Sequence, residues 1–266
     1  MRQNNFRKMN NCRTRGIVLS ISDHGESDKI VTFYSPDLGK ATAIAKGAKR
    51  SKKRFVNKLE EFSLLEMLYN PPKKEGLLFL HEAELENAFL SLRNTYPRYV
   101  AAAFAGELTL CFTREQDPDP FMFSLLLWAL EGLDNNRDPL EICALFHLRI
   151  LGAAGYQPIL EKCGFCGETV RAGHDYSLHP GGGSLVCGAC RSVMKGVTSA
   201  ISVQTLKFLS HAQRVDLGNL GRLRLAGRNI EEALDILHRY TLHLLQHEIH
   251  SWRQVKDLQL AMKKSP

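Results

Sequence analysis

Short runs of alternating apolar and polar residues fill the first third of the chain. They cover residues 16–22, 29–34, 40–45, 62–69 and 77–83, and stretches rich in Asp, Ser, Gly, Asn and Pro separate them at 23–28, 35–39 and 70–72. Alternation with a period of two is typical of strands with one buried face, and the residues between the runs favour turns. Five short strands in about 75 residues predict a small β-barrel, and a barrel of the OB type is the natural expectation.

The apolar period changes from two to 3.6 near residue 87, which indicates helices in the rest of the chain. We expect helices at residues 98–112, 121–133, 139–154, 202–215 and 229–258. Pro118 and Pro120 break the chain before the second helix, Pro139 suits the first turn of the third, and Gly155 suits its C-terminal cap. The predicted fold is therefore multidomain, β plus α, with an OB-fold barrel in residues 1–86 and an all-helical domain in residues 87–266.

Positive charge is concentrated in the first part of the chain. Residues 1–80 carry 16 Lys and Arg against 8 Asp and Glu, whereas the other 186 residues carry 19 against 20. Residues 46–58, called the basic stretch below, hold seven cations and no acid until Glu60, namely Lys46, Lys49, Arg50, Lys52, Lys53, Arg54 and Lys58. Like charges at this density repel unless an anion shares the site, which indicates a polyanion such as nucleic acid or an anionic membrane surface. By itself the stretch is equally compatible with a solvated loop.

Other residues of the predicted barrel are candidates for the same surface. Arg13 and Arg15 share one face of the first strand, where they either extend a track of phosphate contacts or are ordinary surface cations. Phe33, Tyr34 and Phe55 flank the basic stretch in sequence. Since neighbouring strand residues point to opposite faces, at most one of Phe33 and Tyr34 can stack on bases, and the sequence does not say which.

Four of the seven cysteines form a Cys-x2-Cys-x20-Cys-x2-Cys pattern, at Cys163, Cys166, Cys187 and Cys190. Each pair places two thiolates on one tight turn, to which Gly164 and Gly188 lend backbone freedom, and two such turns complete a tetrahedral Zn²⁺ site. Residues 176–186 between the pairs resemble a hairpin. We expect residues 160–195 to form a zinc-ribbon-like insertion holding one structural ion, because four thiolates leave no open coordination position. Two redox pairs or plain buried cysteines are the alternatives.

The histidines offer weaker candidates. His243, His247 and His250 recur at i, i+4 and i+7 on the last predicted helix, but no carboxylate completes a metal site on that face. We therefore expect a polar helix surface there. His24 lies in a predicted turn and is expected to serve the turn rather than catalysis.

Location and redox state follow from what the sequence lacks. The longest apolar run, residues 121–130, is too short to span a bilayer, and the polar N-terminus has no apolar segment of a secretory signal. We expect a cytosolic protein without disulfides, with Cys12, Cys111 and Cys143 in the core. Met9 is a candidate start, which would make residues 1–8 an extension.

Motifs of catalytic sites are missing. The nearest match to a phosphate-binding loop, residues 37–42, lacks the first glycine of G-x4-G-K-[ST] and has Ala41 before its threonine. No H-E-x-x-H, no G-x-S-x-G and no K-x-D-G motif of a nucleotidyl-transferring ligase occurs. We therefore expect that the chain is not an enzyme.

In combination, these motifs closely resemble the RecO family of bacterial DNA repair and recombination mediators. They are R-G-I-V-L at residues 15–19, H-G-E-S-D-K-I-V-T at 24–32, L-G-K at 38–40 and A-K-G-A-K-R-S-K-K-R-F at 45–55, followed by the four cysteines around a Gly-Gly pair. The resemblance covers nearly the whole chain from residue 10 onward. G-E-x-D (Gly25, Glu26, Asp28) and K-G-A-[KR]-[KR] at residues 46–50 are fairly specific to the family.

The resemblance implies an OB-fold domain, a helical domain and a zinc motif that many members carry. It implies a bacterial cytoplasmic, nucleoid-associated protein that binds single- and double-stranded DNA, anneals complementary strands and needs no nucleotide. It also implies that, with RecR and RecF, the protein helps load RecA onto strands covered by single-stranded-DNA-binding protein, whose C-terminal tail it contacts. The expected DNA-binding residues are the seven cations of the basic stretch together with Arg13 and Arg15. The alternatives are a protein-binding adaptor built on the apolar helix near residues 121–133, or a DNA-processing enzyme of the ligase or nuclease kind.

Overall fold

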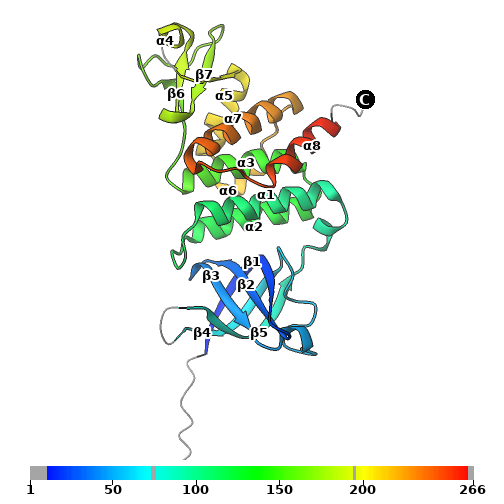
Figure 1. Ribbon diagram of the computed structural model, residues 1–266. Helices are drawn as coiled ribbons and strands as arrows, with labels where there is room; N and C mark the ends of the chain where they lie inside the picture. Colours follow the sequence, from blue (N-terminus) through cyan, green and yellow to red (C-terminus); the bar gives the residue numbers. More distant parts are fainter. Residues whose placement is uncertain (1–10, 73–75, 194–195, 263–266) are drawn as a thin grey trace, which may run out of the picture. The chain divides into compact units, whose positions relative to one another are not determined.

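The computed structural model describes residues 11–72, 76–193 and 196–262 of the 266-residue chain (Figure 1). By their contacts these residues form two compact units. The first unit comprises the chain up to Phe89 together with Thr113–Phe123, and the second comprises Leu90–Phe112 and the chain from Ser124 onward. Nothing in the sequence pattern predicted that residues 113–123 belong to the first unit. The extension expected at residues 1–8 lies outside the described residues.

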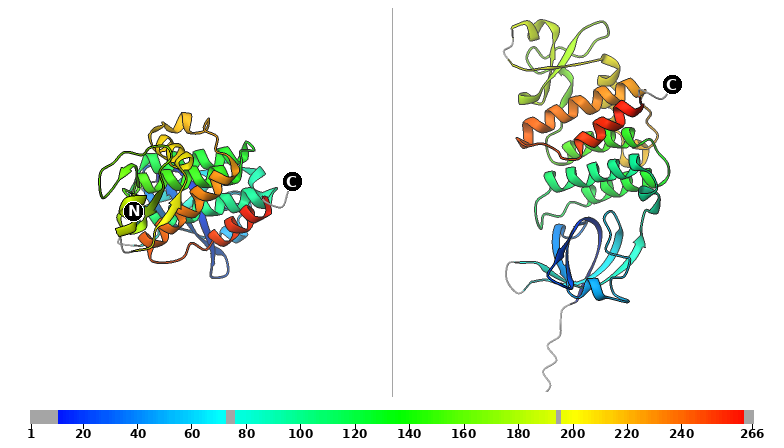
Figure 2. Two further views of the ribbon diagram at one scale, coloured as in Figure 1. Left: turned by 90° about the horizontal axis from the view of Figure 1, so that it is seen from above. Right: turned by 45° about the vertical axis from the view of Figure 1, so that its right-hand side comes forward.

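The first unit is a closed barrel of five strands in the order β1-β2-β3-β5-β4 (Figures 1 and 2). Neighbouring strands pair in antiparallel fashion, except that β3 and β5 close the barrel in parallel. The predicted OB-type barrel is confirmed. The strands are β1 (Cys12–His24), β2 (Asp28–Ser35), β3 (Gly39–Ala45), β4 (Leu64–Asn70) and β5 (Leu78–Asn87), with the 3-10 helix η1 (Ala48–Arg50) after β3.

The barrel closes because small residues alternate with large ones on its inner face. Strand β3 points Ala41, Ala43 and Ala45 inward, which leaves room for the fully buried Phe33 and Met67. A Cβ atom added to Gly16 of β1 would lie 2.3 Å from the Met67 Cε atom and 2.8 Å from the Phe33 Cδ2 atom, so any larger residue there would force these core side chains to shift. Burial of large apolar side chains in close contact is the main stabilising term of such a barrel.

The second unit is helical, as predicted. In Figure 1, α3 lies between α1 and α7, consistent with the contacts among these helices. The Asp119 carboxylate accepts the backbone N–H of Phe121 at 2.8 Å, and Asp138 caps α3 in the same way ahead of Pro139. The helices are α1 (Tyr96–Phe112), α2 (Pro120–Asp134), α3 (Pro139–Ala153), α5 (Val203–Arg214), α6 (Leu217–Leu220), α7 (Gly227–Leu245) and α8 (Trp252–Met262), preceded by the 3-10 helix η2 (Leu90–Arg93).

A small sheet is inserted between α3 and α5. Its strands are β6 (Ile159–Cys163), β7 (Tyr176–His179), β8 (Ser184–Cys187) and β9 (Ser199–Ile201), in the order β6-β8-β7-β9. Strands β7 and β8 form the predicted hairpin, joined by the 3-10 helix η3 (Pro180–Gly182), and the short helix α4 (Gly188–Val193) follows. The outer strands β6 and β9 and helix α4 were not predicted.

The single helix expected at residues 229–258 is wrong. Helix α7 ends where Gln246 adopts a left-handed conformation with φ of 58° and returns its N–H to the Leu242 carbonyl. Helix α8 then begins after a turn whose His250 and Ser251 backbone N–H groups both donate to the Glu107 carboxylate at 2.7 Å. A carboxylate contributed by α1 therefore caps α8 and fixes the break.

This break also separates the three histidines of the predicted helix face. His243 lies in the last turn of α7, whereas His247 and His250 lie in the connection to α8. They therefore do not share one helix face. Within the described residues they join no cluster of metal-binding groups.

Candidate nucleic-acid interface and metal centre

The basic stretch begins directly after the last residue of β3 and packs against the barrel. Ala48 and Phe55 within it and Leu59 just beyond it are buried in the barrel core, whereas Val56 is exposed. The Ser51 hydroxyl accepts the backbone N–H of Phe55 at 3.1 Å, which closes a turn inside the stretch. Because the apolar side chains anchor the segment, the cations between them are held at the surface.

The turn between β1 and β2 fixes the beginning of the basic stretch. The Asp28 Oδ1 atom accepts the backbone N–H of Gly47 at 2.8 Å, and the Ser27 carbonyl accepts that of Lys49 at 2.9 Å. Gly47 itself has φ of 68°, a left-handed conformation that favours glycine. The hydrogen bonds from Gly47 and from the Ser27 hydroxyl lower the pKa of Asp28 below its usual value, so this carboxylate stays ionised.

Two cations of the stretch face acids of the same turn. The Lys49 Nζ atom lies 3.0 Å from Asp23 Oδ2, and Arg50 Nη2 lies 3.7 Å from Glu26 Oε2. Lys49 Nζ also donates to the Gly25 carbonyl at 3.1 Å. These contacts hold the ammonium and guanidinium groups in place and partly neutralise them.

The remaining cations of the stretch are arranged differently. Arg54 donates to the Lys46 and His81 carbonyls at 3.1 and 3.2 Å, and its guanidinium carbon lies 5.0 Å from the centre of the Phe55 ring. Among the described residues no acid lies within ion-pair distance of the four other lysines, Lys46, Lys52, Lys53 and Lys58. The stretch therefore presents four lysines whose charge is available to an external anion.

Arg13 and Arg15 lie on a face of the barrel that is rich in glutamates. Arg13 Nη1 pairs with Glu66 Oε1 at 2.9 Å, and Arg15 makes a two-pronged contact with Glu86, with Nη2 to Oε2 at 2.6 Å. The hydrogen bond and charge of Glu66, with smaller effects of Glu84 and Glu82, raise the pKa of Arg13. A phosphate at this face would have to displace carboxylates that already accept these donors.

None of the three candidate aromatic residues is available for stacking. Phe33 and Phe55 are buried in the barrel core, at 1% and 3% exposure. Alternation predicted that one residue of the Phe33–Tyr34 pair would lie in the core, and that residue is Phe33. Tyr34 points to the other face but is also fully buried. Its hydroxyl donates to the Asp119 carbonyl, and burial raises its pKa to about 12. The sequence left open which of these residues could stack on bases, and their burial leaves none of the three accessible, with Asp119 of the 113–123 segment bound to Tyr34.

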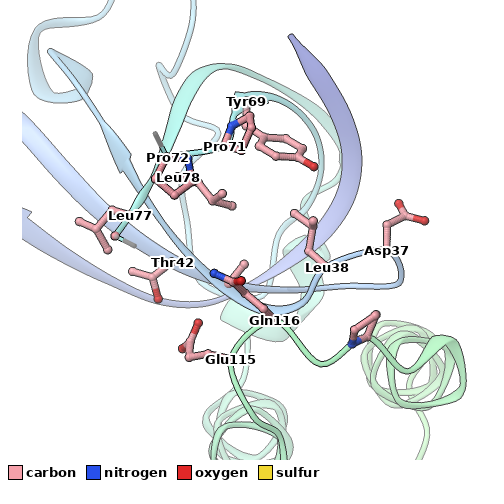
Figure 3. Close-up of a pocket in the computed structure, with 13 residues that line it drawn as sticks. Asp37, Leu38, Thr42, Tyr69, Pro71, Pro72, Leu77, Leu78, Glu115 and Gln116 are labelled. Carbon is pink, nitrogen blue, oxygen red and sulfur yellow. The ribbon is translucent and has the colours of Figure 1, made fainter. Parts of the chain in front are cut away.

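A pocket of about 790 Å³ opens elsewhere in the first unit (Figure 3). Leu38, Tyr69 and Leu78 extend into it, and its charged lining residues are Asp37 and Glu115. No cation lines it within the described residues. Without a cation among the described lining residues, these two carboxylates disfavour a phosphate here.

The four predicted zinc ligands come together in the inserted sheet. Cys163 ends β6, Cys187 ends β8, Cys190 lies in α4, and their sulfur atoms and that of Cys166 all lie within 4.8 Å of one another. The Sγ atoms of Cys166 and Cys187 are 3.8 Å apart. A tetrahedral ion with Zn–S bonds of about 2.3 Å requires sulfur separations of roughly 3.8 Å, so the cluster fits a four-coordinate Zn²⁺.

The electrostatics of the cluster also suit a cation. Burial alone would raise the pKa of the Cys163 thiol, but N–H groups of Cys166, Cys187 and Phe165 donate to its sulfur and lower the pKa to about 6. The Cys190 pKa is raised to about 12, mainly by its side-chain hydrogen bond with Cys187. Four adjacent thiolates are stable together only when a bound cation offsets their charge.

The glycines of the two turns act differently from the prediction. A Cβ atom at Gly164 would lie 2.5 Å from the Ser184 Oγ atom, so Gly164 is required by close packing. The left-handed conformation falls on Gly167, with φ of 75°, just after the second ligand. Gly188 has ordinary space around it and no left-handed conformation, so the role expected for it is wrong. Of the other cysteines, Cys143 is buried and Cys12 and Cys111 are partly buried.

The structure adds residues that the motifs alone had not assigned. Asp23, Ser27 and Asp28 hold the basic stretch, yet the sequence reading gave them only a turn. The register of the β2–β3 hairpin could have indicated this contact. Lys29 pairs with Ala45, so the residues just before Lys29 lie beside the residues just after Ala45.

In the described part of the chain, no helix is both long and apolar enough to cross a membrane.

Comparison with known proteins covers almost the whole chain. The family model described as "Recombination protein O N terminal" matches residues 9–89, and "Recombination protein O C terminal" matches residues 93–253. A "DNA repair protein RecO" of Syntrophobacter fumaroxidans is 36% identical over 216 residues, covering 81% of this chain and 85% of that protein. Those of Syntrophus aciditrophicus and Desulfatibacillum aliphaticivorans are 29% and 32% identical, covering 93% and 92% of this chain and 96% of each relative.

Proposed function

The chain belongs to the RecO family of DNA repair proteins, and from this premise we propose that it binds DNA through the basic stretch and anneals complementary strands without catalysing a chemical step. The DNA-binding domain is residues 1–86, and the site comprises Lys46, Lys49, Arg50, Lys52, Lys53, Arg54 and Lys58. Arg13 and Arg15 contribute less than the sequence suggested, because glutamates already bind them.

One observation carries this proposal. The cations of the basic stretch are held at the surface by a buried apolar anchor and by the Asp28–Gly47 hydrogen bond, and four of its lysines have no acid beside them in the described structure. Concentrating unpaired charge on a packed segment costs stability, and binding of a polyanion offsets that cost. A segment that served only as a solvated loop would not need such an anchor.

The mechanism is electrostatic. Lysines that bind the phosphates of two strands release counterions and lower the repulsion that slows pairing. Each neutralised phosphate adds roughly 0.7 to the log–log salt slope for single strands and 0.9 for duplex DNA. Four to seven engaged cations therefore give a slope on the order of −3 to −6. Since Phe33, Tyr34 and Phe55 are buried, the surface sets affinity and salt dependence and does not read bases.

The metal centre supports the other unit. Cys163, Cys166, Cys187 and Cys190 would hold one Zn²⁺, which cross-links β6, β8 and α4 and supplies no chemistry to a substrate. Its role is to stabilise the inserted sheet, whose own apolar core is small.

Membership of the family supports a proposal for partners and location. We place the protein in the bacterial cytoplasm at the nucleoid. There it would act with RecR, and RecF where present, to load RecA onto strands coated by single-stranded-DNA-binding protein, and it would contact the C-terminal tail of that protein. No described residue is assigned to these contacts.

The alternatives find less support in the structure. An adaptor built on α2 would need its apolar residues at the surface, but Leu125, Leu126, Leu130 and Leu133 are fully buried. An enzyme of the ligase or nuclease kind would need the motifs that the sequence lacks. Turnover of labelled DNA by the purified chain would establish such an activity.

The direct test is fluorescence annealing of complementary oligonucleotides, with and without single-stranded-DNA-binding protein. The wild-type protein should accelerate annealing, and Lys49→Ala/Arg50→Ala/Lys53→Ala should slow it and weaken DNA binding without loss of folding. A matched control removes three exposed cations of the second unit, Lys207, Arg228 and Arg253, and should retain annealing. Equal loss in both variants, or unchanged binding of the first at low salt, would contradict the assignment.

A further inference from the structure

A small depression lies between the β1–β2 turn and the basic stretch. Its volume is about 390 Å³, and its polar lining includes Lys29, Lys49, Ser51 and Asn57, with Asp23 and Glu60 as its acids. Its apolar lining residues are Ala48, Phe55, Val56 and Leu59. Two ammonium groups, a hydroxyl and an amide are groups that bind a phosphate oxygen.

The Asp23 carboxylate takes part in this site as an anion. Its Oδ2 atom lies 3.0 Å from the Lys49 Nζ atom, the distance of a charge-assisted hydrogen bond. The two side chains differ in exposure, since Lys49 is 26% exposed and Asp23 is 69% exposed. Lys49 is also bound to the Gly25 carbonyl. The lysine is therefore fixed by the protein, whereas the carboxylate is held mainly by the lysine.

Arg50 and Glu26 repeat the arrangement in weaker form. Their charged atoms are 3.7 Å apart and their side chains are 73% and 93% exposed. A pair so exposed contributes little by itself and breaks readily. Asp23 lies near the end of β1, Glu26 in the turn that follows and Asp28 at the start of β2. Asp28 differs from the other two acids because it is bound to the backbone of the stretch.

We propose that this depression is a phosphate subsite of the DNA surface, in which the Asp23 carboxylate occupies the phosphate position in the free protein and leaves it when DNA binds. The inference rests on the proposed function and adds to it a competitor built into the site. A phosphodiester and a carboxylate each carry one negative charge and accept the same N–H donor. DNA displaces Asp23 because neighbouring phosphates engage the unpaired lysines at the same time.

This arrangement has a consequence for annealing. The acid keeps the subsite ordered and partly neutralised between encounters, and it lowers the affinity for any single phosphate. A strand bound at such a site can shift its register without leaving the protein, which pairing of complementary strands requires. Removing the acid should therefore tighten DNA binding.

The test is Asp23→Asn, which removes the charge and keeps the size of the side chain. Affinity for a labelled single-stranded oligonucleotide should rise about two- to fivefold at roughly 50 mM salt, the range expected when one exposed ion pair no longer competes. Glu131→Gln makes the same change in net charge at an exposed position of α2 and should give less than half of that gain. In a Lys49→Gln background the Asp23→Asn gain should disappear.

Two results distinguish the inference from its premise. If the wild-type protein does not bind the oligonucleotide, both the proposed function and the subsite are wrong. Suppose instead that the wild-type protein binds and that substitution of the stretch lysines weakens binding. The subsite alone is then overturned if Asp23→Asn binds DNA no more tightly than Glu131→Gln, or if Asp23→Asn raises the affinity equally in the Lys49→Gln background. Thermal melting confirms that each variant is folded.

Discussion

The Asp28 carboxylate accepts the backbone N–H of Gly47 at 2.8 Å and so joins the turn after β1 to the first residues after β3. The bond links the two sequence motifs that are most specific to the family, G-E-x-D and K-G-A-[KR]-[KR]. This bond gives the Asp28 carboxylate a role beside the seven cations. Its hydrogen-bond partner is the main-chain N–H of Gly47, which has a left-handed conformation.

This relationship makes a prediction that runs against simple charge counting. Asp28→Ala removes a negative charge near the basic stretch, which by charge alone would tighten DNA binding. Because it also releases the Gly47 N–H and loosens the stretch, we expect binding to weaken by on the order of threefold. Asp28→Asn keeps an acceptor oxygen and should stay close to wild type. Oligonucleotide titration of both variants decides the matter, and tighter binding by Asp28→Ala would show that the bond has no positioning role.

The paired arginines and the unpaired lysines should behave differently. Lys52→Ala/Lys53→Ala should flatten the single-strand salt slope by about 1.4, the value for two lost phosphate contacts. Arg13→Ala/Arg15→Ala should change the slope by less than about 0.5, because glutamates already neutralise these guanidinium groups. Both slopes come from affinity measured over a range of salt. Equal changes in the two variants would restore Arg13 and Arg15 to the DNA surface.

Removal of the metal should affect the second unit alone. We expect one zinc ion per chain by elemental analysis and none in Cys187→Ser. A chelator, or that substitution, should lower the melting temperature of the helical unit while single-strand binding by the barrel persists. Cys111→Ser, outside the cluster, serves as the control and should keep its zinc. Unchanged melting after complete zinc removal would exclude a structural role.

Acid should destabilise the second unit through a buried histidine. His147 is fully buried, with its Nε2 atom 2.7 Å from the Thr241 hydroxyl, and burial together with nearby His238 lowers its pKa to about 3. The unfolded chain takes up this proton near pH 6.5, so the stability contribution is complete above that pH and is lost as the pH falls towards 3. Between pH 6.5 and 5 the loss is about 2 kcal/mol.

The check is thermal melting at several pH values for the wild-type protein and His147→Gln. The difference between the two isolates this histidine, because both proteins keep the four cysteines and His238. The variant should lose less stability on acidification. Parallel curves would mean that His147 does not titrate on unfolding.

The sequence predicted those parts of the fold that depend on local patterns. Alternation along β3 places Ala41, Ala43 and Ala45 inside the barrel, and aspartate followed by proline marks the start of α3. The cysteine spacing located the metal centre because two tight turns and four thiolates define it almost completely. These features need no information from distant segments.

The features that sequence reading missed are set by contacts between distant residues. The chain between Leu245 and Trp252 has no proline or glycine to end a helix, and the deciding group is the Glu107 carboxylate on another helix. Alternation could not say which of Phe33 and Tyr34 points away from the barrel core, and it could not show that the 113–123 segment covers Tyr34. In the basic stretch, composition showed seven cations but could not show which of them already face Asp23 or Glu26.

The most direct measurement is the salt dependence of single-strand affinity for the wild-type protein and for a variant with Lys46, Lys52, Lys53 and Lys58 all changed to Gln. The log–log salt slope of the wild-type protein should be about −3 or steeper. The slope of the variant should be shallower by roughly 3, because each of the four lost phosphate contacts contributes about 0.7. Melting of the variant should match that of the wild type. A slope that stays within about 0.5 of the wild-type value would show that DNA binds elsewhere and would contradict the account.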